Sequence, residues 1–353
     1  MGSVKDQIVI KKPTPTTMGE GIFHFSDRYS VFDWGEMPER IAGKGAALCL
    51  MGAYCFKRLE EKGIQTHYKG LVDINKKSVS LKKANQPTNK MKVKLVNIYY
   101  PNVKKGPQGK IEYDYSIYTP ELRNCLIPLE IIYRNSLPEG SSVFKRLEEG
   151  KTTIGELGLD HNPKPNERLD KPIFDVSTKL EQTDRYLTWA EAKKIVGLTD
   201  QELEEIKTIL GKINNIITEI AAKAGLVNED GKIELAFDEH RRFMVVDVVG
   251  TLDECRFTYN GLHVSKEVAR QFYKKTSWYQ DVEEAKKAAE EKGIKNWKTI
   301  CKSQPPKLDP QLRTLISEMY IATANEFTKQ RLFNAPSLEQ VVQNLRQYMG
   351  EKA

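Results

Sequence analysis

The chain has 353 residues, 39% apolar and 29% charged, so it is long enough for two lobes and too apolar to be disordered. Its 55 lysines and arginines exceed the 48 acidic residues, but they are spread along the whole chain, which argues against a dedicated nucleic-acid-binding segment. No stretch approaches the ~18 apolar residues that span a bilayer, and no secretory signal opens the chain, so we expect a cytoplasmic protein without a membrane segment.

The cysteines are odd in number, widely spaced and without a C-x-x-C pair. This pattern argues against a disulfide framework and against a zinc site, and it favours buried free thiols. The five positions are Cys49, Cys55, Cys125, Cys255 and Cys301.

The first part of the chain is predicted to be rich in strands. Residues 7–11 and 21–25 are typical of strands, with a Pro/Thr turn between them. Apolar residues at helical spacing predict a helix over 44–62, which Gly63 would end. Residues 66–134 favour an antiparallel sheet with a long excursion, whose lysine-rich part we interpret as a solvated strand face rather than a binding patch.

The second part is predicted to contain more helix. Thr199 and Glu202 form a capping-box pattern ahead of a long amphipathic run that closes at Gly225. Strands are predicted at 232–235 and 243–249, and after Arg256 the chain is mainly helical. Strands first and helices later, with few β-α-β alternations, predict an α+β fold.

Two acidic residues are predicted to lie one hairpin apart. Glu234 and Asp247 belong to neighbouring predicted strands, so their carboxylates could converge on one cation. Oxygen ligands of this kind suit Mg²⁺, which usually binds one or two carboxylates together with substrate phosphates. The alternative is a pair of ordinary acidic residues on adjacent exposed strands.

A basic and hydroxyl-rich segment follows the apolar strand that ends at Arg134. It contains Ser142 within a Gly-Ser-Ser turn, and Arg256 could reach the same anion from beyond the acidic hairpin. Guanidinium groups, hydroxyls and free backbone N–H groups are the groups that hold a phosphate monoester. A surface turn that leads into a basic helix explains the same residues equally well. Nucleophile-elbow, H-E-x-x-H, Walker and Rossmann motifs are missing from the sequence.

Six short segments occur along the chain in the order in which one protein family carries them. They are S-D-R-Y-S-V-F-D at 26–33, I-A-G-K-G at 41–45, L-I-P-L-E with its following turn at 126–135, S-V-F-K-R at 142–146, P-I-F-D-V-S-T-K-L-E at 172–181 and the segment 247–256. Together they resemble the conserved segments of SAICAR synthetases, in a divergent, archaeal-type form. The resemblance covers about 10–275, apart from additions at about 70–120 and after 275.

The resemblance implies an ATP-grasp-related, two-lobed α+β fold that binds ATP between its lobes. We expect a β-rich lobe at 1–125 with an insertion at about 70–120, a ligase lobe at 126–275 and a helical C-terminal extension at 276–353. The implied reaction joins L-aspartate to carboxyaminoimidazole ribotide (CAIR) with ATP and Mg²⁺, giving SAICAR in purine biosynthesis. Whether the chain forms a homo-oligomer stays open.

The resemblance also implies a role for individual residues. It assigns ATP binding to Lys12, Glu130 and Lys232, and catalysis to Lys179, Asp184 and Lys232. It assigns the metal to Glu234 and Asp247, and the ribotide phosphate to Arg134, Ser142 and Arg256.

The sequence departs from the family pattern in three places. Lys11-Lys12-Pro13-Thr14-Pro15 replaces the glycine-rich turn that covers the ATP phosphates, while Thr183 and Val248 stand where the family has a histidine and an acidic residue. These departures leave two alternatives open. One is a related carboxylate–amine ligase with another ribotide or amine, and the other is a non-catalytic nucleotide- or RNA-binding protein of the same fold.

Overall fold

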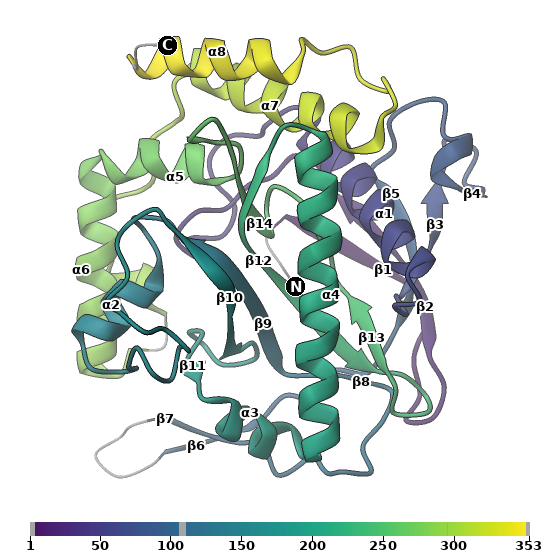
Figure 1. Cartoon of the computed structure of the whole chain (residues 1–353), viewed down its shortest axis with the longest axis vertical. Coiled ribbons are helices and arrows are strands. Elements are labelled where there is room, and N and C mark those ends of the chain that lie inside the picture. Colours follow the sequence, from purple (N-terminus) through teal and green to yellow (C-terminus); the bar gives the residue numbers. More distant parts are fainter. Residues whose placement is uncertain (1–3, 106–110, 295, 351–353) are drawn as a thin grey trace.

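Two antiparallel sheets form the body of the protein, as the computed structural model in Figure 1 shows for residues 4–105, 111–294 and 296–350. The smaller sheet has the strand order β1-β2-β5-β3-β4. Its strands are β1 (Lys5–Lys11), β2 (Gly19–Phe25), β3 (Tyr68–Val72), β4 (Ser78–Val79) and β5 (Lys90–Leu95). The ribbon of β6 (Asn102–Lys105) and β7 (Ile111–Asp114) stands apart from it.

The larger sheet has the order β11-β10-β9-β12-β14-β15, and β12 is long enough to pair with β8 and β13 at its other end. Because β12 joins both halves of this sheet, residues on it can serve sites at either end. The strands are β8 (Cys125–Leu126), β9 (Leu129–Leu137), β10 (Glu167–Thr178), β11 (Tyr186–Leu187), β12 (Val227–Phe237), β13 (Phe243–Val246), β14 (Cys255–Tyr259) and β15 (Leu262–His263).

Two of the long helices begin at caps that the sequence supplies. Asp27 accepts hydrogen bonds from the backbone N–H groups of Gly43 (3.2 Å) and Gly45 (2.9 Å) at the start of α1 (Lys44–Glu61). Thr199 and Glu202 form the predicted capping box of α4 (Asp200–Lys223). The other helices are α2 (Ser142–Glu148), α3 (Trp189–Val196), α5 (Glu267–Lys274), α6 (Ser277–Lys292), α7 (Pro310–Thr328) and α8 (Leu338–Met349).

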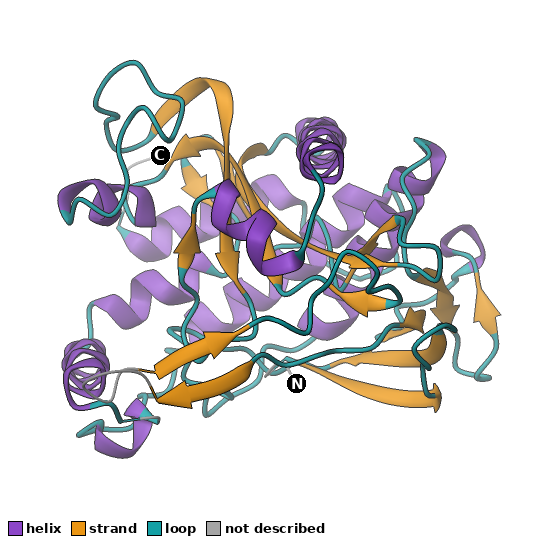
Figure 2. Cartoon of the chain, turned by 90° about the horizontal axis from the view of Figure 1, so that it is seen from below, coloured by secondary structure: helices purple, strands orange, loops and turns teal. Residues whose placement is uncertain are grey.

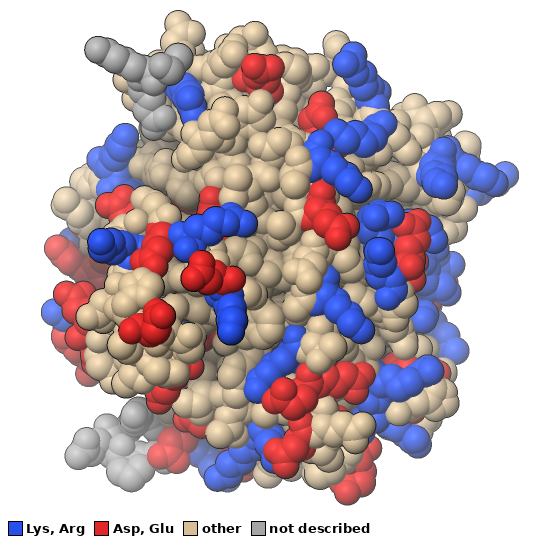
Figure 3. All heavy atoms as spheres, in the orientation of Figure 1, with Lys and Arg blue, Asp and Glu red and all other residues tan. Residues whose placement is uncertain are grey.

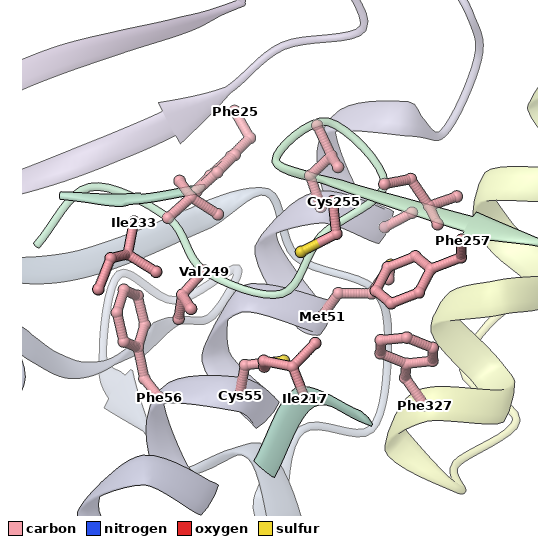
Figure 4. Close-up of a cluster of buried hydrophobic side chains, with 14 of the residues drawn as sticks. Phe25, Met51, Cys55, Phe56, Ile217, Ile233, Val249, Cys255, Phe257 and Phe327 are labelled. Atoms are coloured by element: carbon pink, nitrogen blue, oxygen red, sulfur yellow. The ribbon is translucent and has the colours of Figure 1, made fainter. Parts of the chain in front are cut away.

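One hydrophobic core joins the sheets and the helices. Helix α4 packs against β9 and β12, and α7 packs against α1, as Figures 1 and 2 show from two sides. The C-terminal helices therefore complete the core. Figure 4 shows where side chains from α1, α4, β12, β14 and α7 meet: Met51, Cys55, Phe56, Ile217, Ile233, Cys255, Phe257 and Phe327.

The structure confirms the predicted α+β class and most of the predicted elements. The helix at 44–62, the capped helix at 199–225 and the strands around 232–249 all form. Cys49, Cys55, Cys125 and Cys255 are buried free thiols as expected, and Cys301 is half-buried. Strand β10, with 12 residues, lies in a region where the sequence predicted no strand. The three-part division at 125 and 275 stays a prediction.

The described surface mixes charges of both signs. In the view of Figure 3 acidic side chains lie among the basic ones, and the basic ones gather on the side where β3 and β5 lie in Figure 1. There Glu20 forms ion pairs with Lys69 and with Lys92, the latter at 2.7 Å. None of the helices in the described ranges is both long and apolar enough to cross a bilayer.

Candidate active site

One face of the larger sheet carries the charged side chains of the site. Side chains two residues apart on a strand point to the same face, so Asp230, Lys232 and Glu234 on β12 share a face. The same rule places Glu130 and Arg134 of β9 on one face, and the register sets Arg134 opposite Asp230. Two charged groups result, one toward each end of the β9–β12 pair.

The first group, here called the acid–lysine cluster, is a chain of ion pairs. The Lys232 ammonium lies 2.7 Å from Glu130 Oε1 and 3.1 Å from Glu254 Oε2. The Lys179 ammonium, just after β10, lies 2.5 Å from Glu234 Oε1 and 3.6 Å from Glu130 Oε1. The members of the cluster are Lys5, Glu130, Lys179, Lys232, Glu234, Asp247 and Glu254.

Asp247 enters this cluster from the turn directly after β13. Glu234 pairs with Val246 in the β12–β13 ladder, which brings the next residue, Asp247, close to Glu234. Asp247 has a positive φ of 63°, an uncommon conformation for a residue other than glycine, and a His67 ring nitrogen lies 3.2 Å from its carbonyl oxygen. Its carboxylate accepts a hydrogen bond from the Lys5 ammonium of β1, so the cluster draws residues from both sheets.

The electrostatics of the cluster keep its lysines charged. Burial lowers the pKa of Lys179 and Lys232, but the carboxylates around them raise it more, so both pKa values lie above the ordinary value. Burial and the charge of Asp247 raise the pKa of Glu234. Burial also raises the pKa of Asp247, but Lys5, Lys179 and Lys232 lower it to well below the usual range. The two lysines are therefore cations that can neutralise an anionic substrate, and they are poor general bases.

The second group, here called the arginine cluster, holds three guanidinium groups around two buried carboxylates. The Arg256 Nε of β14 donates a hydrogen bond to Asp230 Oδ1 at 2.9 Å, and its Nη2 forms an ion pair with Asp230 Oδ2 at 2.5 Å. Arg134 lies 3.1 Å from Asp175 Oδ2 and 3.6 Å from Asp230 Oδ2. Arg146 of α2 donates to Asp175 as well.

Two hydroxyl groups complete the arginine cluster. The Arg134 Nη2 donates to Ser142 Oγ and to the Tyr186 hydroxyl, both at 3.3 Å, and the two hydroxyls lie 2.7 Å apart. The Arg146 guanidinium lies 3.9 Å from the centre of the Tyr186 ring, within the range of a cation–π interaction. The structure thus brings Arg134, Ser142 and Arg256 together.

Lys12 and Asp184 lie outside the ion pairs of both clusters. Lys12 is exposed in the turn between β1 and β2, and the described contacts do not join it to the acid–lysine cluster. Asp184 is exposed in the turn before β11, but partial desolvation and the nearby charges of Glu130 and Asp33 raise its pKa to about 6. Asp184 therefore lies close enough to the cluster to interact with it electrostatically.

The sequence analysis missed several members of the two clusters. Arg146 belongs to the S-V-F-K-R segment, so its pattern was available. Alternation with Lys232 and Glu234 would have found Asp230 once β12 was extended toward its N-terminal end. Asp175 and Glu254 likewise lie within the segments 172–181 and 247–256, whereas no local pattern singles out the last missed members, Lys5 and Tyr186.

Comparison with known proteins was made against a family profile, curated relatives and solved structures. The profile of the SAICAR synthetase family matches residues 14–292. A protein of Archaeoglobus fulgidus, provisionally described as a phosphoribosylaminoimidazole-succinocarboxamide synthase, is 47% identical over 99% of this chain and 100% of its own length. The Thermoplasma acidophilum enzyme of that description is 33% identical over 75% of this chain and 81% of its own length.

Solved structures agree in fold. A type-2 SAICAR synthetase in complex with ADP aligns with a TM-score of 0.55 and 22% identity over 87% of this chain and 99% of that one. The SAICAR synthase of Saccharomyces cerevisiae in complex with SAICAR aligns with a TM-score of 0.61 and 20% identity over 94% of both chains.

The family profile and the named relatives indicate an enzyme of the ligase class, and the described structure has one cation-rich and one carboxylate-rich group on the same sheet face. The chain belongs to the SAICAR synthetase family. Membership confirms the predicted fold class and the expectation of a ligase that uses ATP. It favours the SAICAR reaction over the two alternatives left open by the sequence.

Proposed function

We propose that this chain joins L-aspartate to CAIR with the hydrolysis energy of ATP, giving SAICAR, ADP and phosphate in purine biosynthesis, and that the two clusters form its active site. Family membership supports the reaction. The observation that carries the site is the location of both clusters on one face of β9 and β12.

The two clusters differ in net charge in the way that the substrates require. The arginine cluster sets three guanidinium groups against two carboxylates, so it keeps one positive charge for a phosphate monoester. The acid–lysine cluster sets four carboxylates against three ammonium groups, so it keeps one negative charge for a cation. We assign the ribotide phosphate to Arg134, Ser142 and Arg256, and ATP with its metal to the other cluster.

Mg²⁺ fits the carboxylates of the acid–lysine cluster. Glu234 and Asp247 offer oxygen ligands on neighbouring segments, and their mutual repulsion, which raises the pKa of Glu234, is the kind that a divalent cation relieves. Two carboxylates together with phosphate oxygens and water form a suitable ligand set. When bound, magnesium neutralises charge that develops on the transferring phosphoryl group.

The chemistry proceeds by activation of a carboxylate, which is by itself a poor electrophile. A CAIR carboxylate oxygen attacks the γ-phosphorus of ATP and ADP leaves. The aspartate ammonium loses one proton, the resulting amine attacks the acyl carbon, and phosphate leaves as the nitrogen loses a second proton. Lys179 and Lys232, both held charged, stabilise the negative charge of the phosphoryl group. Asp184, with its pKa raised to about 6, is suited to accept a proton from the aspartate nitrogen.

Glu130 and Lys12 complete the proposed ATP contacts. Glu130 holds Lys232 in place at 2.7 Å, at the start of the strand that we expect to line the adenine pocket. Lys12 lies in the turn that follows β1, and Lys5 at the start of β1 donates a hydrogen bond to Asp247. A cytoplasmic location stays a prediction, and whether the chain forms a homo-oligomer stays open.

The test is an ADP-release assay with ATP, Mg²⁺, CAIR and L-aspartate, in which each component is omitted in turn. We expect ADP only when all four are present, together with SAICAR identified by its mass. ADP release that does not need CAIR or aspartate would contradict the proposed reaction. Turnover with a different ribotide or amine would support the related-ligase alternative.

A further inference from the structure

The turn at 179–185, which joins β10 to β11, carries two residues of the proposed reaction. Its first residue is Lys179, whose ammonium belongs to the acid–lysine cluster, and Asp184 lies near its end. The Thr178 N–H donates to the Arg185 carbonyl oxygen at 2.9 Å, so the two ends of the turn are joined to each other. The conformation of the turn then depends on what holds the residues between these ends.

The middle of this turn is held from outside by the β6–β7 ribbon. Among the contacts of the described residues, a single hydrogen bond involves the backbone of residues 180–184: the Gln182 N–H donates to the Tyr113 hydroxyl at 3.0 Å. Tyr113 lies on β7, and in Figure 1 the ribbon lies at the same end of the molecule as β11. The ribbon thus supplies a partner that the turn does not find in its own sheet.

A second tyrosine beside the ribbon reaches the turn through a side chain. The Tyr115 hydroxyl donates to Glu181 Oε1 at 3.0 Å, and Arg185 Nη2 donates to the same oxygen, also at 3.0 Å. The Glu181 side chain is only 4% exposed. Burial and the charge of Glu181 raise the pKa of Tyr115, so its hydroxyl stays protonated and donates to the carboxylate. One tyrosine therefore holds the backbone of the turn, and the other holds a buried carboxylate.

The base of the ribbon is anchored in the body of the protein. Tyr115 and Tyr118 are 8% and 5% exposed and belong to the hydrophobic core, with ring centres 6.2 Å apart. Tyr113 and Tyr115 are two residues apart and share a face of the chain, whereas Asp114 between them bonds within the ribbon to Lys104 at 2.6 Å. The ribbon therefore presents two tyrosines to the turn from a fixed base.

We propose that Tyr113 and Tyr115 are positioning residues, which hold the 179–185 turn so that Lys179 and Asp184 stay in place at the acid–lysine cluster. This inference rests on the proposed function, in which Lys179 stabilises the transferring phosphoryl group and Asp184 accepts a proton. Displacement of such groups slows the chemical step more than it weakens substrate binding. The ribbon lies in the addition at about 70–120, which thereby gains a role in the reaction.

The kinetic test uses tyrosine-to-phenylalanine changes, each of which removes one hydroxyl and leaves the ring in place. In Tyr113→Phe and in Tyr115→Phe we expect kcat to fall about three- to tenfold, the change that the loss of one hydrogen bond accounts for. The Kd for CAIR, measured by calorimetry, should change less than about twofold, because we assign the ribotide phosphate to the arginine cluster. This division between kcat and Kd separates positioning from a general loss of structure.

The matched control is Tyr118→Phe. The Tyr118 hydroxyl donates to the Tyr99 carbonyl oxygen at 2.6 Å, so the same chemical change breaks a hydrogen bond at the base of the ribbon and leaves both contacts with the turn. We expect kcat of this variant to stay within about twofold of the unaltered value. Two results would overturn the inference: an unchanged kcat in both Tyr113→Phe and Tyr115→Phe, or an equal loss of kcat in Tyr118→Phe.

Amide hydrogen exchange provides a readout that does not need turnover. The Gln182 N–H loses its acceptor in Tyr113→Phe, so a peptide that spans 179–185 should exchange about three- to tenfold faster than in the unaltered protein. Tyr118→Phe should leave this rate unchanged. Equal exchange in Tyr113→Phe and in the unaltered protein would count against the inference. A lack of turnover in the unaltered enzyme would instead contradict the proposed function, and the exchange rates would still decide whether the ribbon orders the turn.

Discussion

The two charged clusters share one sheet face but are built differently. In the arginine cluster the Arg134 side chain is 3% exposed, and its guanidinium is fixed by two aspartates and two hydroxyls. In the acid–lysine cluster Lys179 and Lys232 are 25% and 26% exposed and reach the carboxylates at the ends of long side chains. A planar guanidinium held by several partners suits a group that stays bound, whereas an ammonium on a flexible stem can follow a phosphoryl group as it moves.

The largest effect is expected at the acid–lysine cluster. Asp247→Asn removes a negative charge that the proposed metal and lysines need, so ADP release should fall by about 10²–10³-fold or more. Binding of CAIR, measured by calorimetry, should change little, because the arginine cluster is untouched. Asp114→Asn, on the exposed β6–β7 ribbon, is the control. Equal loss of turnover and of CAIR binding would indicate misfolding instead.

The next largest effect is expected at the arginine cluster. Ser142→Ala removes a hydroxyl that Arg134 and Tyr186 both contact, and a hydrogen bond to a charged group accounts for roughly a 10- to 100-fold change in affinity. We expect the Kd for CAIR to rise by that factor while the KM for ATP is unchanged. Ser141→Ala is the matched control, since Ser141 caps the same helix. Equal effects of the two changes would assign the loss to the helix.

A smaller effect, on the KM for ATP, is expected to distinguish substitution of Lys5 from substitution of Lys12. Lys5 bonds to Asp247, whereas Lys12 is exposed in the neighbouring turn, so Lys5→Met should raise the KM for ATP more than Lys12→Met does. A partly exposed ion pair accounts for up to about fivefold. Steady-state kinetics with ATP as the varied substrate measure both. A larger effect of Lys12→Met would show that the β1–β2 turn closes over ATP despite its missing glycines.

The smallest effect on activity is expected from a change in α4, the helix that packs against the strands carrying both clusters. Thr199→Ala breaks the capping box of α4, which packs against β9 and β12, and should lower the free energy of unfolding by about 1 kcal/mol. Urea denaturation measures the loss. The KM values for CAIR and ATP should stay equal to those of the unaltered protein. A selective change in one KM would reveal that one cluster depends on α4 more than the other.

Local sequence patterns were sufficient to predict the elements whose ends are fixed by residues within the element or next to it. The capping box at Thr199 and the glycine after α1 both act within one turn of helix, so the sequence located those helix ends. Strand β10 was not predicted from the sequence, because its N-terminal half is charged and exposed and this hides the apolar character of its buried half. The ordered family segments contain Arg134, Ser142 and Asp247, and the predicted hairpin of two acidic strands indicated Glu234 beside Asp247.

Only the tertiary structure decided which side chains meet. Lys5 and Asp247 are 242 positions apart, and Trp34 meets Trp278 and Trp297 across most of the chain. Neither contact leaves a periodic signal, because the register of the sheets and the packing of α6 determine it. The sequence by itself determined the fold class, the family and the main chemical groups, since these rest on local spacing and motif order. The division of those groups into a carboxylate-rich and a guanidinium-rich cluster follows from the pairing of β12 with β9 and β14, which brings distant charges onto one face.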